Sequence, residues 1–149
     1  TAFYYACSHA KIDYSGFMNT TARIALKLIP DSLQTQPVFL CVDDTIVSKF
    51  GTKFEDVSKL FDHATHNGSN YLNGHCFVSV MLCVPVRNGD KVSYLSVPLG
   101  YRMWKKKESK LELAASMIQQ VMSEFRSKEH VIILCDSWYT KQNLVSIVD

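Results

Sequence analysis

The chain has 149 residues, of which 47% are hydrophobic, 20% charged and 11% aromatic, and its formal net charge is +2. This length suits one domain that buries roughly two thirds of its unfolded surface, and the hydrophobic content argues against wholesale disorder. The apolar runs are far shorter than the ~20 residues that a membrane span needs, and no secretory signal is visible. Because the charge is nearly neutral, an anion-binding surface has to come from local clustering.

The cysteines indicate the cellular setting. There are five, an odd number, and no Cys-x-x-Cys spacing occurs. Cys41, Cys83 and Cys135 lie inside apolar runs, which is typical of buried free thiols and favours a reducing, cytoplasmic setting. The chain begins with Thr1 and ends at Asp149 inside a helical pattern, so we expect it to be a fragment of a longer protein.

The first predicted elements are a helix and a buried strand. Apolar residues at helical spacing predict an amphipathic helix over 16–29. The apolar run 38–42 predicts a strand buried on both faces, and we expect Asp43 and Asp44 to follow its end. Residues 47–74 are polar and rich in turn formers, which indicates an insertion between two strands.

A short helix is expected at 53–63, within the insertion. A β-hairpin is predicted after the insertion. A second long strand is predicted over 75–86. The turn sequence Asn-Gly-Asp at 88–90 joins it to a partner strand over 91–101. Because Pro98 cannot donate a ladder hydrogen bond, the far end of the strand over 91–101 is expected at a sheet edge or a bulge.

The last third of the chain is predicted to be helix, strand and helix. Residues 109–125 carry apolar side chains on one helical face, and Ser109 with Glu112 forms a capping box. The apolar run 130–136 predicts another buried strand, and a further helix begins within 142–149. The order of elements predicts an α/β fold, in which a mixed sheet is flanked by helices.

Acidic residues follow two of the predicted strands: Asp43 and Asp44 follow the first, and Asp136 the fourth. If these strands are parallel neighbours, the acids meet at the carboxyl edge of the sheet. Carboxylates brought together repel, and a divalent cation removes that penalty. Mg²⁺ prefers such oxygen ligands, and two ions ~4 Å apart would promote phosphoryl transfer on nucleic acid. The alternative role for each Asp is a helix N-cap or a turn.

Four segments resemble the catalytic core of bacterial insertion-sequence transposases of the DDE class, which have a ribonuclease H-like fold. They are PVFLCVDDTIVSKFG at 37–51, NGHCFVSVMLCVPV at 73–86, YLSVPLGYRMW at 94–104 and VIILCDSWY at 131–139. The resemblance implies a helical lead-in segment over 1–36 and a partial ribonuclease H-like catalytic domain over 37–149. That domain has its insertion at about 47–74 and is truncated at its C-terminus.

The resemblance also implies a reaction and the residues that carry it. Asp44, directly before a Thr, and Asp136 would bind Mg²⁺ or Mn²⁺ in a two-ion site, with Asp43 as the fallback for Asp44. The implied reaction is phosphodiester hydrolysis and strand transfer at mobile-element ends, with double-stranded DNA and a second copy of the chain as partners. The family's third acid is a Glu on a downstream helix, which nothing here matches. We therefore expect this chain alone to bind metal weakly and not to cleave DNA.

Four lysines are candidates for contact with DNA. Lys105, Lys106 and Lys107 form the densest positive patch, and Lys49 lies five positions after Asp44. Contact with phosphates would appear as salt-dependent DNA binding. The alternatives are a solvated face for the basic run and an ordinary loop position for Lys49.

Other residues point more weakly to function. His63, His66 and His75 invite a zinc site, but they lack the spacing of paired zinc ligands, so a polar loop is expected. Trp138 and Tyr139 are expected to pack, with stacking on an unpaired base as the alternative. Three competing functions stay open: a phospho-accepting receiver domain, a non-catalytic remnant that binds DNA or a partner, and another ribonuclease H-like nuclease such as a junction resolvase.

Overall fold

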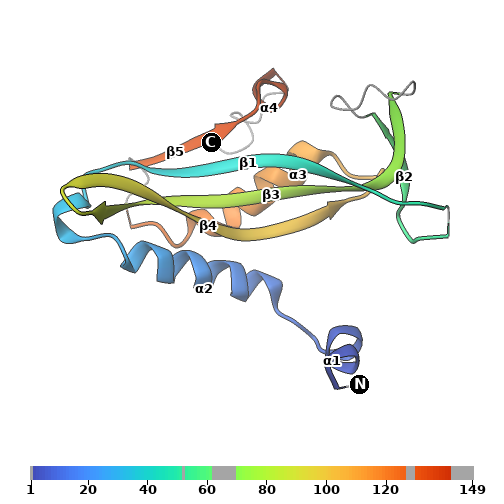
Figure 1. Ribbon diagram of the computed structural model, residues 1–149, viewed down its shortest axis with the longest axis horizontal. Coiled ribbons are helices and arrows are strands. Elements are labelled where there is room, and N and C mark those ends of the chain that lie inside the picture. The colour runs from blue at the N-terminus through green and yellow to red at the C-terminus, as the bar shows by residue number, and fades with distance from the viewer. Residues whose placement is uncertain (1, 52, 62–69, 127–129, 142–149) are drawn as a thin grey trace.

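The computed structural model describes residues 2–51, 53–61, 70–126 and 130–141, and all structural statements refer to these ranges. The strands are β1 (Val38–Ser48), β2 (Ser58–Phe61), β3 (Tyr71–Asn88), β4 (Lys91–Trp104) and β5 (Val131–Cys135). The helices are α1 (Ala2–His9), α2 (Tyr14–Lys27), the short 3₁₀ turn η1 (Asp31–Leu33), α3 (Lys110–Met122) and α4 (Ser137–Lys141). Figure 1 shows the sheet of long strands and the helices that flank it.

The five strands form one mixed sheet. Its order is β2-β3-β1-β5, and β4 pairs with β3 as well. β3 is antiparallel to β1, β2 and β4, whereas β5 is parallel to β1. The predicted α/β class, with a mixed sheet and flanking helices, is confirmed.

The parallel pairing of β1 with β5 joins segments that are far apart in the chain. Val38 lies opposite Val131, and Val42 lies opposite Cys135. Both strands run in the same direction, but β5 ends at Cys135, level with Val42, whereas β1 continues to Ser48. The expectation that the first and fourth predicted strands are parallel neighbours is confirmed.

The hairpin between β3 and β4 also follows its prediction. Asn88 pairs with Lys91, and Gly89 between them has a φ of 60°. Asp90, the second turn residue, does not have positive φ, so the turn is type II′, which Gly at the first position adopts without strain. The register shifts near Pro98, which pairs with Met81, and this irregularity is the bulge that a proline in a strand predicts.

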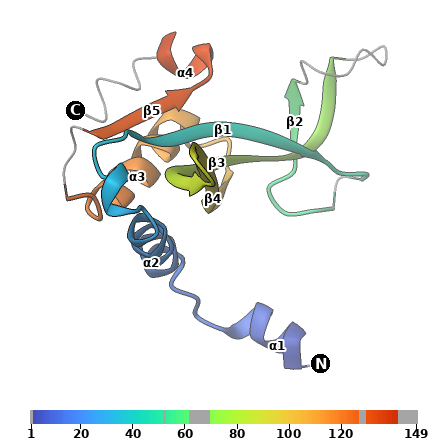
Figure 2. The same ribbon diagram turned by 60° about the vertical axis from the view of Figure 1, so that its left-hand side comes forward.

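One face of the sheet is packed against α2 and α3 (Figure 2). Helix α2 places Met18, Ala22 and Ala25 in the core, so the helical lead-in shares one hydrophobic core with the sheet. Helix α3 begins with the predicted capping box of Ser109 and Glu112. The core residues from the other elements are Val38, Leu40, Val42, Val78, Val80, Leu82, Val84, Leu99, Leu111, Ala114, Ala115, Met117, Ile118, Val121 and Tyr139.

Several predicted boundaries are wrong. β1 does not end before the acids, because its pairing with β3 continues to Ser48, so Asp43 and Asp44 lie inside the strand. Within 53–61, the described part of the helix expected at 53–63, a turn leads into β2, whose side chains alternate between buried and exposed as it pairs with β3. β3 begins at Tyr71, so strand residues also occupy both ends of the region 47–74.

Two predictions fall outside the described residues: the helix expected within 142–149, and the positions of His63 and His66. Cys41, Cys83 and Cys135 are free thiols, as predicted, but each is partly exposed, so their predicted burial is wrong; Cys76 is free and buried. Among the described helices, none is long and apolar enough to cross a membrane.

Candidate functional site

The Asp44 carboxylate accepts hydrogen bonds from three side chains. Its side chain points to the helical face of β1 and is 22% exposed. Oδ2 accepts a hydrogen bond from Lys110 Nζ at 2.7 Å and another from Cys76 Sγ at 3.3 Å. Oδ1 accepts one from the Tyr139 hydroxyl at 3.2 Å. Both carboxylate oxygens therefore have donors.

These donors come from three different elements. Cys76 lies near the start of β3, Lys110 is the first residue of α3, and Tyr139 lies in α4 directly after β5. Cys76 and Tyr139 are each 1% exposed, so their polar atoms need partners, and Asp44 supplies the acceptors. The site is therefore where the central strand, the capped helix and the segment after β5 meet.

Two tryptophans flank the ammonium group of Lys110. Its Nζ lies 5.6 Å from the ring centroid of Trp104 and 5.8 Å from that of Trp138. Cation–π attraction at these distances favours the charged amine. Trp138 is 44% exposed, so the Lys110 site lies close to solvent.

The pKa values of the group reflect this arrangement. Burial alone would raise the pKa of Asp44, but the hydrogen bond and charge of Lys110, helped by Cys76 and Tyr139, lower it. Burial would lower the pKa of Lys110, and Asp44 more than offsets this, so that pKa is raised. Burial raises the pKa of Cys76 to about 11, so its thiol stays protonated and donates. Asp44 and Lys110 are therefore both charged near neutral pH.

The other two predicted acids are in a different environment. Asp43 faces the opposite side of β1, is exposed, and accepts a hydrogen bond from the backbone N–H of Asp44. Asp136 is also exposed and follows Cys135, the residue paired with Val42, so along the strands it is level with Asp43. Asp136 Oδ1 accepts from the backbone N–H of Ser137, where α4 begins. An N-cap side chain accepts from the second or third helical N–H, so this contact with the first residue of α4 is not an N-cap bond.

The carboxylates suit a divalent cation by their chemistry. Mg²⁺ commonly takes one or two protein carboxylates, but Asp136 is level with Asp43, which faces away from the Asp44 side of the sheet. Among the residues that the structure describes, no three His, Cys, Asp or Glu side chains gather as a metal-binding group. The positive charge beside Asp44 in this structure is the Lys110 ammonium.

Two of the predicted DNA-contacting lysines, Lys49 and Lys105, contact the segment that precedes β2. Lys105 forms an ion pair with Asp56 at 2.9 Å, whereas Lys106 and Lys107 are exposed in the turn before α3. Lys49 Nζ lies 5.8 Å from the ring centroid of Phe54. The turn that carries the basic run connects Trp104 to α3, so the run is adjacent in the chain to Lys110.

Sequence reasoning missed the partners of Asp44. A lysine at the first position of a helix faces the positive end of the helix dipole, which is unfavourable unless a carboxylate compensates. Lys110, directly after the cap Ser109, was therefore a readable signal. Cys76 and Tyr139 carry no comparable signal, because their register against β1 is a property of the folded sheet.

His75, considered for zinc, contacts the backbone oxygen of Glu55 at 2.8 Å through Nε2.

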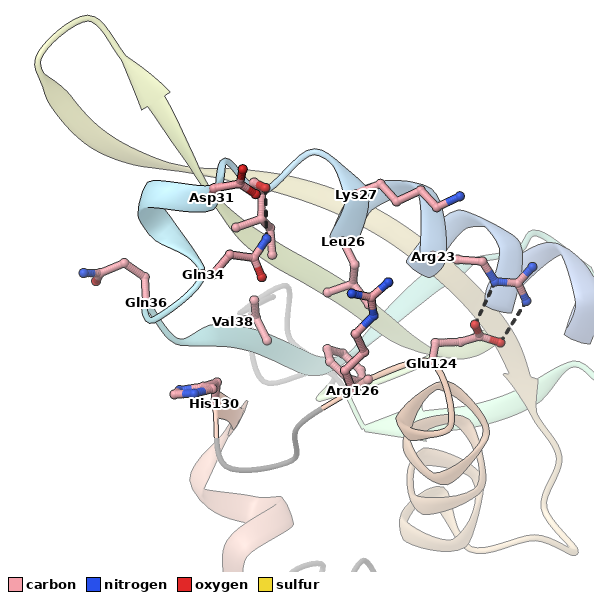
Figure 3. A pocket seen from close by; sticks show the side chains of 12 residues that line it. Arg23, Leu26, Lys27, Asp31, Gln34, Gln36, Val38, Glu124, Arg126 and His130 are labelled. Carbon is pink, nitrogen blue, oxygen red and sulfur yellow. Dashed lines mark hydrogen bonds and ion pairs between the residues drawn. The ribbon is translucent and has the colours of Figure 1, made fainter.

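A pocket of about 390 Å³ lies elsewhere, at the start of β1 (Figure 3). Val38 and Phe125 contribute apolar surface to it, and the ion pair of Arg23 with Glu124 stands at its edge. Val38 is the first residue of β1 and Asp44 the seventh, so this pocket is separate from the Asp44 site.

Comparison of the chain with protein-family models, with curated proteins and with solved structures gave no match. The chemistry of the Asp44 site therefore rests on its own residues and their geometry.

Proposed function

We propose that this chain is a ribonuclease H-like core of a DDE-class transposase, which cleaves and joins DNA phosphodiesters with Mg²⁺ or Mn²⁺. The observation that supports the proposal is the parallel pairing of β1 with β5, since it brings Asp136, one residue after Cys135, to nearly the same level of the sheet as Asp44, two residues after Val42. Functional groups of open α/β sheets gather beyond the carboxyl ends of such strands. The hairpin, the capped helix and the parallel strand follow one another in the order that the resemblance implies.

In this proposal, Asp44 and Asp136 hold the metal, and Asp43 is the alternative to Asp44. The bound cation would stabilise the charge of a phosphodiester and assist the attacking oxygen. The chain's own contribution is to fix Asp44 through β1 and to bind the DNA backbone. Double-stranded DNA would lie along Lys105, Lys106 and Lys107, with Lys49 as a further phosphate contact.

One observation favours a second candidate, a remnant that binds DNA or a partner without metal. The Lys110 ammonium already balances the charge of Asp44, so this carboxylate needs no metal ion to be stable in the fold. A receiver domain is disfavoured, because receivers alternate parallel strands with helices, and here β3 is antiparallel to both β1 and β4. Another ribonuclease H-like nuclease would differ from the transposase in its DNA substrate.

The test is Mn²⁺ binding by the chain, measured by electron paramagnetic resonance. We expect weak binding that is lost in both Asp44→Asn and Asp136→Asn. Asp90→Asn, in the exposed hairpin turn, is the matched control and should bind as the unmodified chain does. DNA binding is then measured against salt with and without Mn²⁺. Binding of Mn²⁺ that ignores Asp44 would contradict the transposase proposal, and metal-independent DNA retention would favour the remnant.

A further inference from the structure

An arm at one end of the sheet combines exposed aromatic rings with lysines. The arm comprises residues 53–61, which include β2, and residues 71–75; Figure 1 shows β2 and the start of β3 bending away from the long strands. We infer that one face of this arm binds an unpaired DNA strand, with its rings stacking on bases and its lysines contacting phosphates. This binding needs no cation at Asp44, and only the choice of DNA over RNA rests on the proposed function.

The register of β3 places lysines and rings on one face of the arm. Lys59 lies opposite Asn73, and Phe61 lies opposite Tyr71, so these four side chains share a face of the β2–β3 pair. On the β1 side of β3, the backbone N–H of Lys49 donates to the backbone oxygen of Asn73 at 2.8 Å, which continues the β1 pairing by one residue. Lys49 and Lys59 therefore flank Asn73 from its two sides.

The segment before β2 is held against the same face. His75 Nε2 lies 2.8 Å from the backbone oxygen of Glu55, and His75 shares the face of Tyr71 because four residues separate them along β3. Lys49 Nζ lies 5.8 Å from the ring centroid of Phe54. These contacts place Phe54 beside Lys49, next to the rings of β2 and β3.

The rings are oriented by their neighbours but stay open to water. Phe54 and Tyr71 are each 52% exposed, and Phe61 is 42% exposed. Phe61 and Tyr71 meet edge to face with their ring centroids 5.3 Å apart, and Lys59 Nζ lies 5.2 Å from the Tyr71 centroid. Exposed rings interleaved with cations are the arrangement on which proteins stack unpaired bases.

The charge around the arm favours nucleic acid as the partner. The described residues 48–51, 53–61, 71–77 and 104–109 contain six lysines and three acidic residues, a balance of +3 with His neutral, whereas the whole chain carries +2. The positive charge of the protein is therefore concentrated here. An apolar protein surface would use the rings but not the lysines. Duplex DNA would use the lysines but not the rings, because its bases are already stacked, whereas an unpaired strand uses both.

The experiment measures binding of a fluorescein-labelled oligothymidine strand of about 12 nucleotides, a length within the site sizes of single-strand-binding folds. Fluorescence anisotropy is recorded in chelator, so the proposed metal site has no influence on the result. Tyr71→Ala should weaken binding about fivefold or more, as the loss of one stacking ring does. Tyr71→Phe keeps the ring and should bind as the unmodified chain does. Lys59→Gln should weaken binding and reduce the slope of log affinity against log salt by about 0.7, the value for one phosphate contact.

Two variants outside the arm are the matched controls. Tyr14→Ala removes a ring that is 73% exposed at the start of α2, and Lys91→Gln removes an exposed cation at the start of β4. Both variants should bind the strand with the affinity and the salt dependence of the unmodified chain.

Equal affinity for the strand and for a duplex of the same length, unchanged in Tyr71→Ala, would overturn the inference and leave the Mn²⁺ test of the proposed function standing. Tighter binding of the matching oligouridine RNA would overturn the choice of DNA. Self-association without DNA that is lost in Tyr71→Ala, measured by analytical ultracentrifugation, would assign the rings to a second copy of the chain and overturn the inference as well. Strand binding that depends on Tyr71, together with Mn²⁺ binding that ignores Asp44, would support the inference and reject the transposase.

Discussion

The two faces of β1 differ sharply in how their residues are used. On the helical face, Leu40 is fully buried and Asp44 is held by three donors. On the other face, Phe39 and Cys41 are partly exposed and Asp43 is exposed. Residues that are neighbours in the chain therefore have unlike environments, because side chains alternate across a strand.

The opposite face of the neighbouring strand β5 is exposed in the same way. Ile132 and Leu134 are 43% and 46% exposed, while Val131 and Ile133 pack against the core. Cys41 lies on this face with its Sγ 3.9 Å from that of Cys83, and burial, then Cys83, raises its pKa to about 11. A polar group on the buried helical face therefore needs hydrogen-bond partners within the protein, whereas one on the exposed face can bond to water.

The largest expected effect comes from replacing two adjacent residues of β1, one on the helical face and one on the opposite face. Leu40→Ala removes a fully buried side chain and should lower the free energy of unfolding by about 2–5 kcal/mol. Cys41→Ala, next to it on the other face, should cost less than about 1 kcal/mol, because the thiol is small and partly exposed. Urea unfolding measures both. Similar losses would mean that the second face is buried in solution.

A smaller effect is expected from the two aspartates. Asp44→Ala leaves the Lys110 ammonium without its carboxylate, and we expect a loss of about 1–2 kcal/mol, reduced by solvent screening from the cost of breaking a fully buried pair. Asp43→Ala, on the open face, should change stability by less than about 0.5 kcal/mol. Chemical unfolding in chelator measures the difference. A larger loss of stability in Asp43→Ala than in Asp44→Ala would mean that Asp43, not Asp44, is the acid that stabilises the fold.

The contrast also explains which features were predictable. The apolar run 38–42 predicted β1 and its burial, and the spacing within 109–125 predicted α3. The end of β1 was misplaced, because residues 43–48 are polar in part and are held in the strand by pairing with β3. The same pairing decides that Asp44, not Asp43, faces the core. A strand with apolar residues on both faces carries no signal for that choice, which depends on Cys76, Lys110 and Tyr139 in the folded sheet.

The smallest effect is a pH dependence that belongs to Asp44 alone. Its pKa is lowered below the ordinary value of 3.8, so its contribution to stability is present above that pH and is lost as the pH falls through the lowered pKa. The pKa of Lys110 is raised, so its contribution is lost only on the alkaline side, above about 10.5. The stability advantage of the unmodified chain over Asp44→Asn should thus be full near neutral pH and should shrink below about pH 4. Unfolding free energies measured in urea between pH 3 and pH 7 give this difference directly. An advantage that grew on acidification would mean that burial outweighs Lys110 at Asp44, and that this carboxylate is paired less tightly in solution than the 2.7 Å contact indicates.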